Sequence, residues 1–150
     1  MSRLCTLYVG LILSIAASAV AAPAEPPPKI PKELLEKRVE AARKVYQQKK
    51  TRLQNGESLP ADLFGWSERW LKAELALGDK KDERVKALRE HLDRTREVER
   101  MAAARARAGQ GLQADADAAT YFRLEAEIRL VKEGVKPHPA KGSKEKGEKP

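Results

Sequence analysis

A repeat with a period of 53 residues, from Arg52 to Arg105, constrains this chain more than any other feature. A segment that recurs at such a spacing is one supersecondary unit, which buries its apolar face only against a neighbouring unit. The segment from Arg52 to Leu77 aligns without a gap to the segment from Arg105 to Leu130. The identical pairs are Arg52/Arg105, Gly56/Gly109, Leu59/Leu112, Ala61/Ala114, Asp62/Asp115, Leu71/Leu124, Ala73/Ala126, Glu74/Glu127 and Leu77/Leu130.

Each copy of the repeat predicts two amphipathic helices joined by a glycine turn, and no segment alternates with the period of a strand. We therefore expect an all-α domain over residues 33–133, made of two tandem helical hairpins (33–80 and 86–133) with coiled-coil-like packing. The four expected helices cover residues 32–54, 60–77, 80–108 and 112–133. Their expected buried seams are Leu35, Val39, Ala42, Tyr46 and Leu53; Leu63, Trp66, Trp70, Ala73 and Leu77; Val85, Leu88, Leu92, Thr95, Val98 and Ala102; and Ala114, Ala118, Tyr121, Leu124, Ile128 and Val131.

Glycine and acidic residues recur at the two predicted turns. Gly56 and Gly109 each follow a helix and can adopt the left-handed conformation that ends it. Ser58 can cap the second helix, and Asp62 and Asp115 lie near the positive ends of helix dipoles. The predicted turn fits a short connection within each hairpin.

The connection between the two repeats is open to two interpretations. Gly78 followed by Asp79 indicates the end of one helix and the N-cap of the next. A single glycine within a long helix costs only about 1 kcal/mol, so a continuous middle helix is the alternative. We predict the break, and with it a compact up-down-up-down bundle that folds as a monomer.

The two ends of the chain differ in composition from its middle. Residues 1–21 predict a secretory signal peptide, with Arg3, an apolar run and the cleavage site Ala19-Val20-Ala21. An uncleaved membrane anchor is the alternative, although the run is short for a bilayer. Residues 22–32 form a proline-rich linker, and residues 134–150 a lysine-rich tail that we expect to be disordered. The expected location is periplasmic or secreted, with outer-membrane association as a further option.

Little in the sequence predicts catalysis, a metal or a cofactor. The only cysteine, Cys5, lies in the expected leader, which leaves no thiol for chemistry. His91 has no metal-ligating partner three or four residues on, so we expect a boundary histidine that packs its ring. His138 lies between two prolines, where we expect no fixed geometry. The acids alternate with Arg and Lys as on a solvated helix face. We therefore expect no enzyme, no catalytic residue, no metal site and no cofactor.

Aromatic residues recur on the second helix of each repeat. Trp66 and Trp70 lie four residues apart, and Tyr121 and Phe122 occupy the fourth helix. One interpretation is an exposed aromatic contact face for a ligand or partner. The other, which we favour, is that large rings fill the space between the hairpins.

The repeat motif resembles the helical hairpins of outer-membrane efflux proteins, the TolC-like family. Those proteins are similar in being internally duplicated, with one motif in each half. This chain carries the motif over residues 35–130, without the family's barrel or its full-length tunnel helices. The residues that carry the resemblance are Gly56, Asp62, Leu71, Ala73, Glu74, Leu75 and Leu77, and again Gly109, Asp115, Leu124, Ala126, Glu127, Ile128 and Leu130.

The sequence predicts an exported, non-catalytic helical interaction or scaffold module of the cell envelope, which associates through its helix faces with a protein partner or with itself. The alternative is a basic binder of an anionic envelope polymer or lipid surface, since the net charge is +8 and the tail is rich in lysine. That charge is spread along the chain rather than concentrated, so we expect no specific binding to nucleic acid.

Overall fold

The computed structural model describes residues 29–138, and these residues form four α-helices without a strand. The helices are α1 (Lys32–Gln54), α2 (Pro60–Leu77), α3 (Lys81–Arg107) and α4 (Gln113–Lys132). The all-α prediction is confirmed, and each helix boundary lies within about a residue of its expected place. The predicted signal peptide, most of the linker and residues 139–150 of the tail lie outside the described residues.

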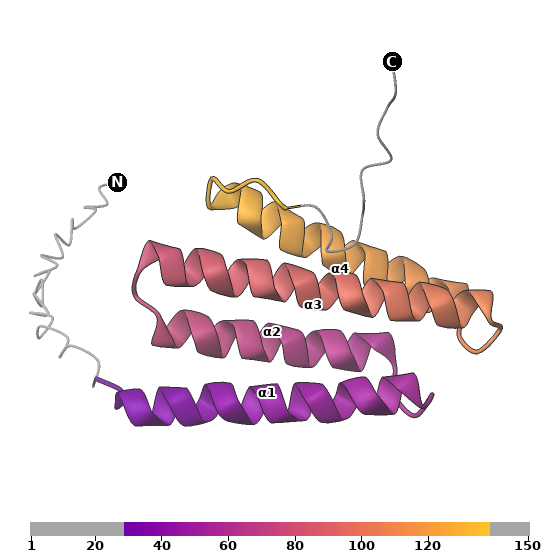
Figure 1. Ribbon diagram of the computed structural model, residues 1–150, viewed down its shortest axis with the longest axis horizontal. Helices are drawn as coiled ribbons and strands as arrows, with labels where there is room; N and C mark the ends of the chain where they lie inside the picture. Colours follow the sequence, from indigo (N-terminus) through magenta and orange to yellow (C-terminus); the bar gives the residue numbers. More distant parts are fainter. Residues whose placement is uncertain (1–28, 139–150) are drawn as a thin grey trace, which may run out of the picture.

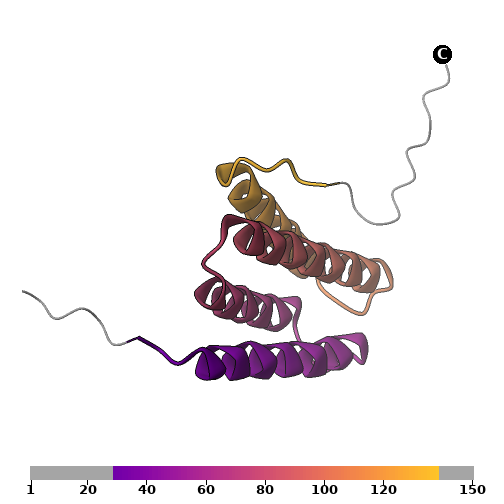
Figure 2. The same cartoon turned by 60° about the vertical axis from the view of Figure 1, so that its left-hand side comes forward.

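The four helices lie side by side in chain order, and neighbouring helices run in opposite directions (Figure 1). We call α1 with α2 the first unit, and α3 with α4 the second unit. Helix α2 packs against α1, α3 and α4, and α3 packs against α4. Helices α1 and α4 lie on opposite sides of the array, as the turned view in Figure 2 confirms. The array is therefore open between α1 and α4.

The buried side chains form two clusters along the array. The first lies toward the two glycine turns and takes residues from all four helices: Tyr46, Leu53, Leu63, Val98, Ala102, Ala116 and Ala119. The second lies toward the other end and takes residues only from α2, α3 and α4: Leu71, Ala87, Leu88, Leu92, Ala126 and Leu130. Helix α1 contributes to one cluster and not to the other, so its N-terminal half packs at the edge of the fold.

The glycine turns form as expected, whereas the predicted helix caps do not. Gly56 and Gly109 have φ angles of +82° and +68°, in the left-handed region that favours glycine. The Ser58 hydroxyl donates to Asp62 Oδ2 at 3.2 Å and does not cap a backbone N–H; Leu59 is the N-cap. The predicted Ser58 cap is therefore wrong, because this hydroxyl bonds to a side chain.

The predicted break between the two middle helices is confirmed. Helix α2 ends at Leu77 and α3 begins at Lys81, so the middle helices are not continuous. Gly78 is extended, with φ −102° and ψ 116°, and is not the left-handed C-cap that the sequence suggested. The N-cap of α3 is Lys80 in place of Asp79. A Cβ added at Gly78 would lie 3.0 Å from Glu83 Cβ, so the position favours glycine because of close approach.

Helix α4 buries a different face from the one that we predicted. The expected seam is on the outside: Tyr121 is 62%, Leu124 45%, Ile128 53% and Val131 58% exposed. The side that faces α2 and α3 carries small residues and one leucine instead. The buried residues of α4 are Ala116, Ala119, Ala126 and Leu130. Small side chains let α4 approach its neighbours closely, and this leaves a second apolar stripe uncovered.

The chain continues along the array after α4. Val135 packs against the second cluster, and its N–H donates to the Leu130 carbonyl at 3.1 Å. His138 Nε2 lies 2.9 Å from Asp93 Oδ1 on α3. Our expectation that His138 has no fixed geometry is therefore wrong, because the residues that follow the helix lie against α3.

Candidate functional site

Helices α2 and α3 hold a buried polar network at their interface. Ser67, His91 and Arg94 are all buried. Ser67 Oγ lies 2.9 Å from His91 Nδ1 and accepts a hydrogen bond of 3.1 Å from Arg94 Nε. His91 Nε2 lies 3.0 Å from Glu68 Oε1, without the alignment of a good hydrogen bond. With the Ser67 hydroxyl donating to Nδ1, the proton of a neutral His91 is on Nε2, beside Glu68.

The surroundings of Glu68 favour its charged form, whereas those of His91 favour its neutral form. Burial on its own would raise the pKa of Glu68, but the neighbouring His91 imidazole and Arg129 guanidinium outweigh it and hold the pKa at about 2. The bond from Arg129 Nη1 to Glu68 Oε1 is 2.6 Å long. Burial lowers the pKa of His91, and the Glu68 carboxylate only partly offsets this effect. The network therefore contains an ionised Glu68 beside a histidine that favours its neutral form.

The order serine, histidine, carboxylate resembles that of a nucleophilic relay, but this geometry excludes that use. A nucleophile must reach a substrate carbonyl, whereas Ser67 has no exposed surface. Its oxygen also accepts the Arg94 Nε–H, which makes it less basic. The expected position of His91 at the boundary of the core is wrong: the imidazole lies inside and bridges α2 to α3.

Arg94 connects this network to aromatic residues of the core. Its guanidinium carbon lies 4.0 Å from the centre of the Trp70 ring, and Nη2 lies 3.4 Å from Glu74 Oε2. Trp70 meets Tyr46 edge to face, with ring centres 5.6 Å apart. Burial raises the pKa of Glu74, which Arg94 opposes. The solvated face that we expected for the acids of α2 is therefore wrong for Glu68 and Glu74, which are mostly buried ion-pair partners.

The four aromatic residues of the predicted contact face do not form one surface. Trp66 and Trp70 are half-buried against the first cluster, as the core-filling interpretation predicts. Phe122 stacks on Phe64 of α2, with ring centres 3.8 Å apart and planes 3° from parallel. Tyr121 alone is mostly exposed. The structure therefore places Tyr121 in the outer stripe of α4 and the other three rings between helices.

The predicted turn residues gather at one end of the array, where Arg105 joins the two turns. Gly56, Asp62, Gly109 and Asp115 line one shallow hollow there. Arg105 Nη1 donates to the Leu53 carbonyl at 2.9 Å, and Nη2 donates to the Gln110 carbonyl at 2.7 Å. The other two motif residues, Glu74 and Glu127, lie along the helices. Glu74 pairs with Arg94. Glu127 pairs with both Arg96 and Arg123.

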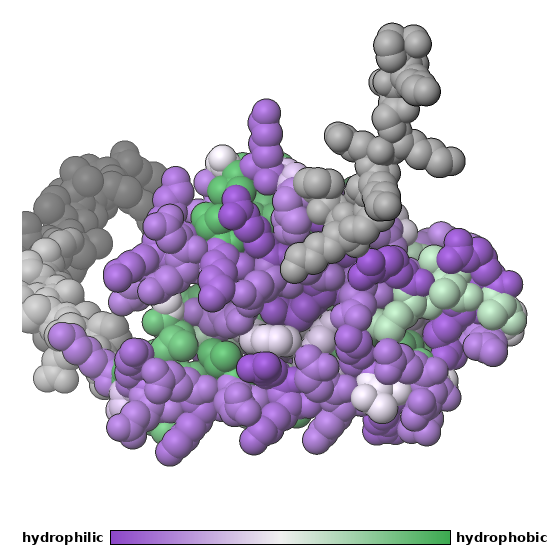
Figure 3. Space-filling model, viewed as in Figure 1, coloured by the Kyte–Doolittle hydropathy of each residue, from purple (hydrophilic) through white to green (hydrophobic). Residues whose placement is uncertain are grey.

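The outer stripe of α4, which we define as Tyr121, Leu124, Ile128 and Val131, gathers four of the eight large hydrophobic side chains that are exposed in the described part of the chain. The hydropathy view agrees, since a hydrophobic patch interrupts the hydrophilic surface over α4 at the top of Figure 3. Exposed apolar patches of this kind mark interaction surfaces when charged residues surround them. Because 35% of the chain is charged, this patch stands out from its surroundings.

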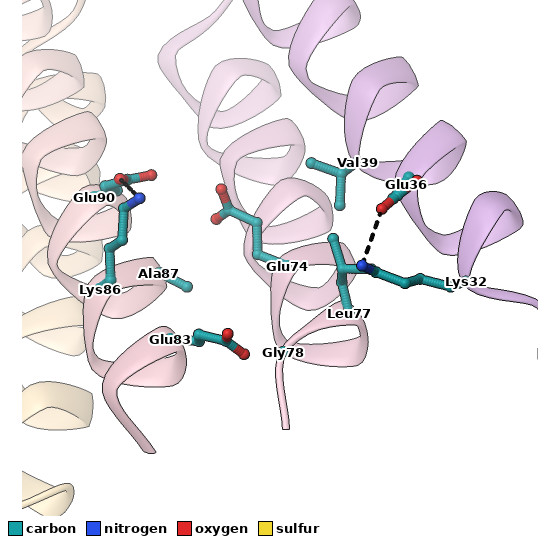
Figure 4. A pocket seen from close by; sticks show the side chains of 10 residues that line it. All are labelled: Lys32, Glu36, Val39, Glu74, Leu77, Gly78, Glu83, Lys86, Ala87 and Glu90. Carbon is teal, nitrogen blue, oxygen red and sulfur yellow. Dashed lines mark ion pairs between the residues drawn. The ribbon is translucent and has the colours of Figure 1, made fainter. Parts of the chain in front are cut away.

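A groove lies between α1 and α3, over the C-terminal end of α2 and opposite to the glycine turns. Figure 4 displays its lining, in which Glu74 lies between α1 and α3. Lys32 pairs with Glu36 at 3.5 Å, and Lys86 with Glu90 at 4.0 Å, so each lysine is matched by a carboxylate on its own helix. The lining also holds Glu74, which pairs with Arg94, and Glu83, so its carboxylates outnumber its two lysines.

Searches for other chemistry end without a candidate. Among residues 29–138, no cluster of three or more His, Asp or Glu residues could hold a metal ion. No helix in the described part is long and apolar enough to span a membrane. No known family model, curated protein or solved structure matches this chain. The outer stripe is therefore the candidate site that the geometry favours most.

Proposed function

We propose that this chain is an exported, non-catalytic helical interaction module of the cell envelope, which binds a helical partner through the outer stripe of α4. In this proposal the two units act as tandem hairpins with coiled-coil-like packing. The observation that carries the proposal is the exposure of the apolar side chains at positions 121, 124, 128 and 131. These positions follow the spacing by which one helix fits the groove of another.

Export and the envelope location rest on the sequence. The leader over residues 1–21 supports secretion, and the likeness of the repeat to TolC-like hairpins suggests an envelope complex as the setting. The buried polar network supports a stable scaffold in this proposal, since it joins the two units through Glu68, His91 and Arg129.

Ion pairing within the helical array does not favour the alternative of a basic polymer-binding surface. Arg96, Arg123 and Arg129 each contact a carboxylate within 3.3 Å. Support for the alternative therefore comes mainly from the lysines of residues 134–150.

Site-specific photo-crosslinking in the native host tests the proposed function. A photoreactive p-benzoylphenylalanine would replace Tyr121 or Ile128 in the outer stripe, or Gln47 on an exposed part of α1 as the matched control. Discrete higher-mass adducts from positions 121 and 128, and none from position 47, are the expected result. Adducts that form equally at all three positions, or at none, would contradict the proposal.

A further inference from the structure

The repeat makes the outer stripe of α4 equivalent to a face of α2 that is already covered. Leu71 and Leu124 occupy the same repeat position, yet Leu71 is 1% exposed and Leu124 is 45% exposed. Leu71 lies in the second cluster with Ala87 and Leu88 of α3. In the first unit, this leucine is therefore buried by the unit that follows it. In the second unit, no described residue covers the equivalent leucine.

Helix α1 shows a matching difference in exposure between equivalent residues of the two units. By the 53-residue register that relates Arg52 to Arg105, Leu34 of α1 is equivalent to Ala87 of α3. Ala87 is buried against α2, whereas Leu34 is 56% exposed. Ala41 and Val45 lie on the same side of α1 as Leu34, at steps of seven and four residues. Helix α1 thus presents outward the face with which its equivalent, α3, meets the preceding unit.

The two glycine turns, at the far end of the array, also differ in the contacts that they receive. A Cβ built on Gly56 would lie 3.3 Å from Nη1 of Arg105, which reaches across from the second unit. A Cβ built on Gly109 would meet no described atom within 4 Å. Arg52, the equivalent of Arg105, has a half-exposed side chain and lies 3.6 Å from Glu57. The carboxyl-terminal turn therefore lacks the arginine contact that the first turn receives.

From these three differences we propose that a second copy of this chain covers the outer stripe, in a head-to-tail stack. Helix α1 of one copy lies on α4 of the preceding copy, as α3 lies on α2 within the chain. Helix α1 is the only described helix that the repeat makes equivalent to α3, so the sequence itself specifies this occupant. This proposal names the partner of the surface under Proposed function and rests on that function.

The register also specifies the contacts between the copies. Glu68 and His91, which meet within the chain, are equivalent to Tyr121 and Arg38. The Arg38 guanidinium of one copy would therefore meet the Tyr121 ring of the other, a favourable cation–π pair. Arg52 would donate to the Ala106 carbonyl, as Arg105 donates to the equivalent Leu53 carbonyl. Such an interface joins two different faces, so it extends into longer stacks unless one face is blocked.

Sedimentation velocity with two single-face variants tests the stack. Leu124→Glu blocks the α4 face and Leu34→Glu blocks the α1 face, while Gln47→Glu adds the same charge elsewhere on α1. Both altered leucines are exposed, so the fold should persist, which circular dichroism would verify. The purified wild type and Gln47→Glu should increase in mass with concentration, from low micromolar upward. Each leucine variant alone should remain a monomer, with association weakened by about tenfold or more.

A mixture of the two leucine variants separates this stack from other arrangements. Each variant retains the face that the other lacks, so an equimolar mixture should form a dimer and nothing larger. Self-association of Leu34→Glu as strong as that of the wild type would overturn the stack, because α4 would then pair with α4. A wild type that stays monomeric throughout would overturn it too. If position 121 still crosslinks to another protein in that case, the proposed function survives with a different partner.

Discussion

At the residue scale, His91 is one of the buried polar residues that join the two units. It lies buried between Ser67 and Glu68, and Glu68 also accepts a hydrogen bond from Arg129 of α4. Polar groups inside a core stabilise it only when their partners are present, since an unpaired buried group costs about 1–3 kcal/mol. The network therefore favours one register of α2 against α3 over a shifted one.

The buried histidine should make stability depend on pH. Burial lowers the pKa of His91 below its ordinary 6.5, so below pH 6.5 the unfolded chain takes up a proton that the folded chain does not. The His91 contribution should be complete above pH 6.5 and decline on acidification toward pH 5, at up to about 1.4 kcal/mol per pH unit. His91→Asn should flatten this slope in urea unfolding at pH 5 to 7.5.

The other histidine supplies the control for that measurement. His138→Asn leaves His91 in its buried network, so the decline that burial of His91 causes should persist in that variant. Glu74 should stabilise the fold on acidification, because burial raises its pKa from 4.5. Every variant retains Glu74, so its effect on stability cancels in the comparison. An unchanged slope in His91→Asn would contradict the role given to burial of this imidazole. A further loss below pH 4.5 is expected from Glu68, whose pKa is about 2.

At the element scale, the two glycine turns have the same backbone but different surroundings. In both, a glycine with positive φ follows a helix, and in both an arginine precedes it by four residues. Arg105 joins its own turn to the turn of the first unit, whereas Arg52 reaches only Glu57. The two turns therefore share a backbone conformation and differ in the residues that contact them.

Two alanine substitutions should separate these arginines. Arg105→Ala removes hydrogen bonds to two carbonyls and should lower the free energy of unfolding by about 1 kcal/mol; the loss is modest because the Gly56 N–H still bonds to the Leu53 carbonyl. Arg52→Ala should change the stability of dilute protein by less than about 0.5 kcal/mol. Equal losses in thermal or urea unfolding would show that the bridge from Arg105 contributes nothing.

The sequence was informative about helices and much less so about which face each helix buries. Glycine chemistry and apolar spacing predicted the ends of α1 and the break before α3, because both depend on local conformation. They were wrong for α4, which carries two apolar stripes, since periodicity cannot tell which of them meets the core. Ser67 gave an unused signal: it lies midway between the buried Leu63 and Leu71 on one face of α2. The histidine that meets it comes from another helix, and one sequence does not reveal that pairing.

At the scale of the whole molecule, the open array explains why a duplicated chain has unlike halves. The inner helices α2 and α3 meet neighbours on both sides, whereas α1 and α4 lie at the edges (Figure 1). Repeat arrays gain stability from the interfaces between units, and their terminal faces must be polar or covered. The outer stripe of α4 is apolar and is left uncovered by the described residues, which makes it the natural place for association.

The cost of truncating the same leucine in each repeat tests this account most directly. Leu71→Ala and Leu124→Ala make one chemical change at one repeat position, and urea unfolding of dilute protein measures both. Leu71→Ala should cost about 3 kcal/mol, because it opens a cavity between the units. Leu124→Ala should cost less than about 1 kcal/mol, since its side chain is 45% exposed. Similar losses for both variants in monomeric protein would contradict the claim that the α4 face is uncovered.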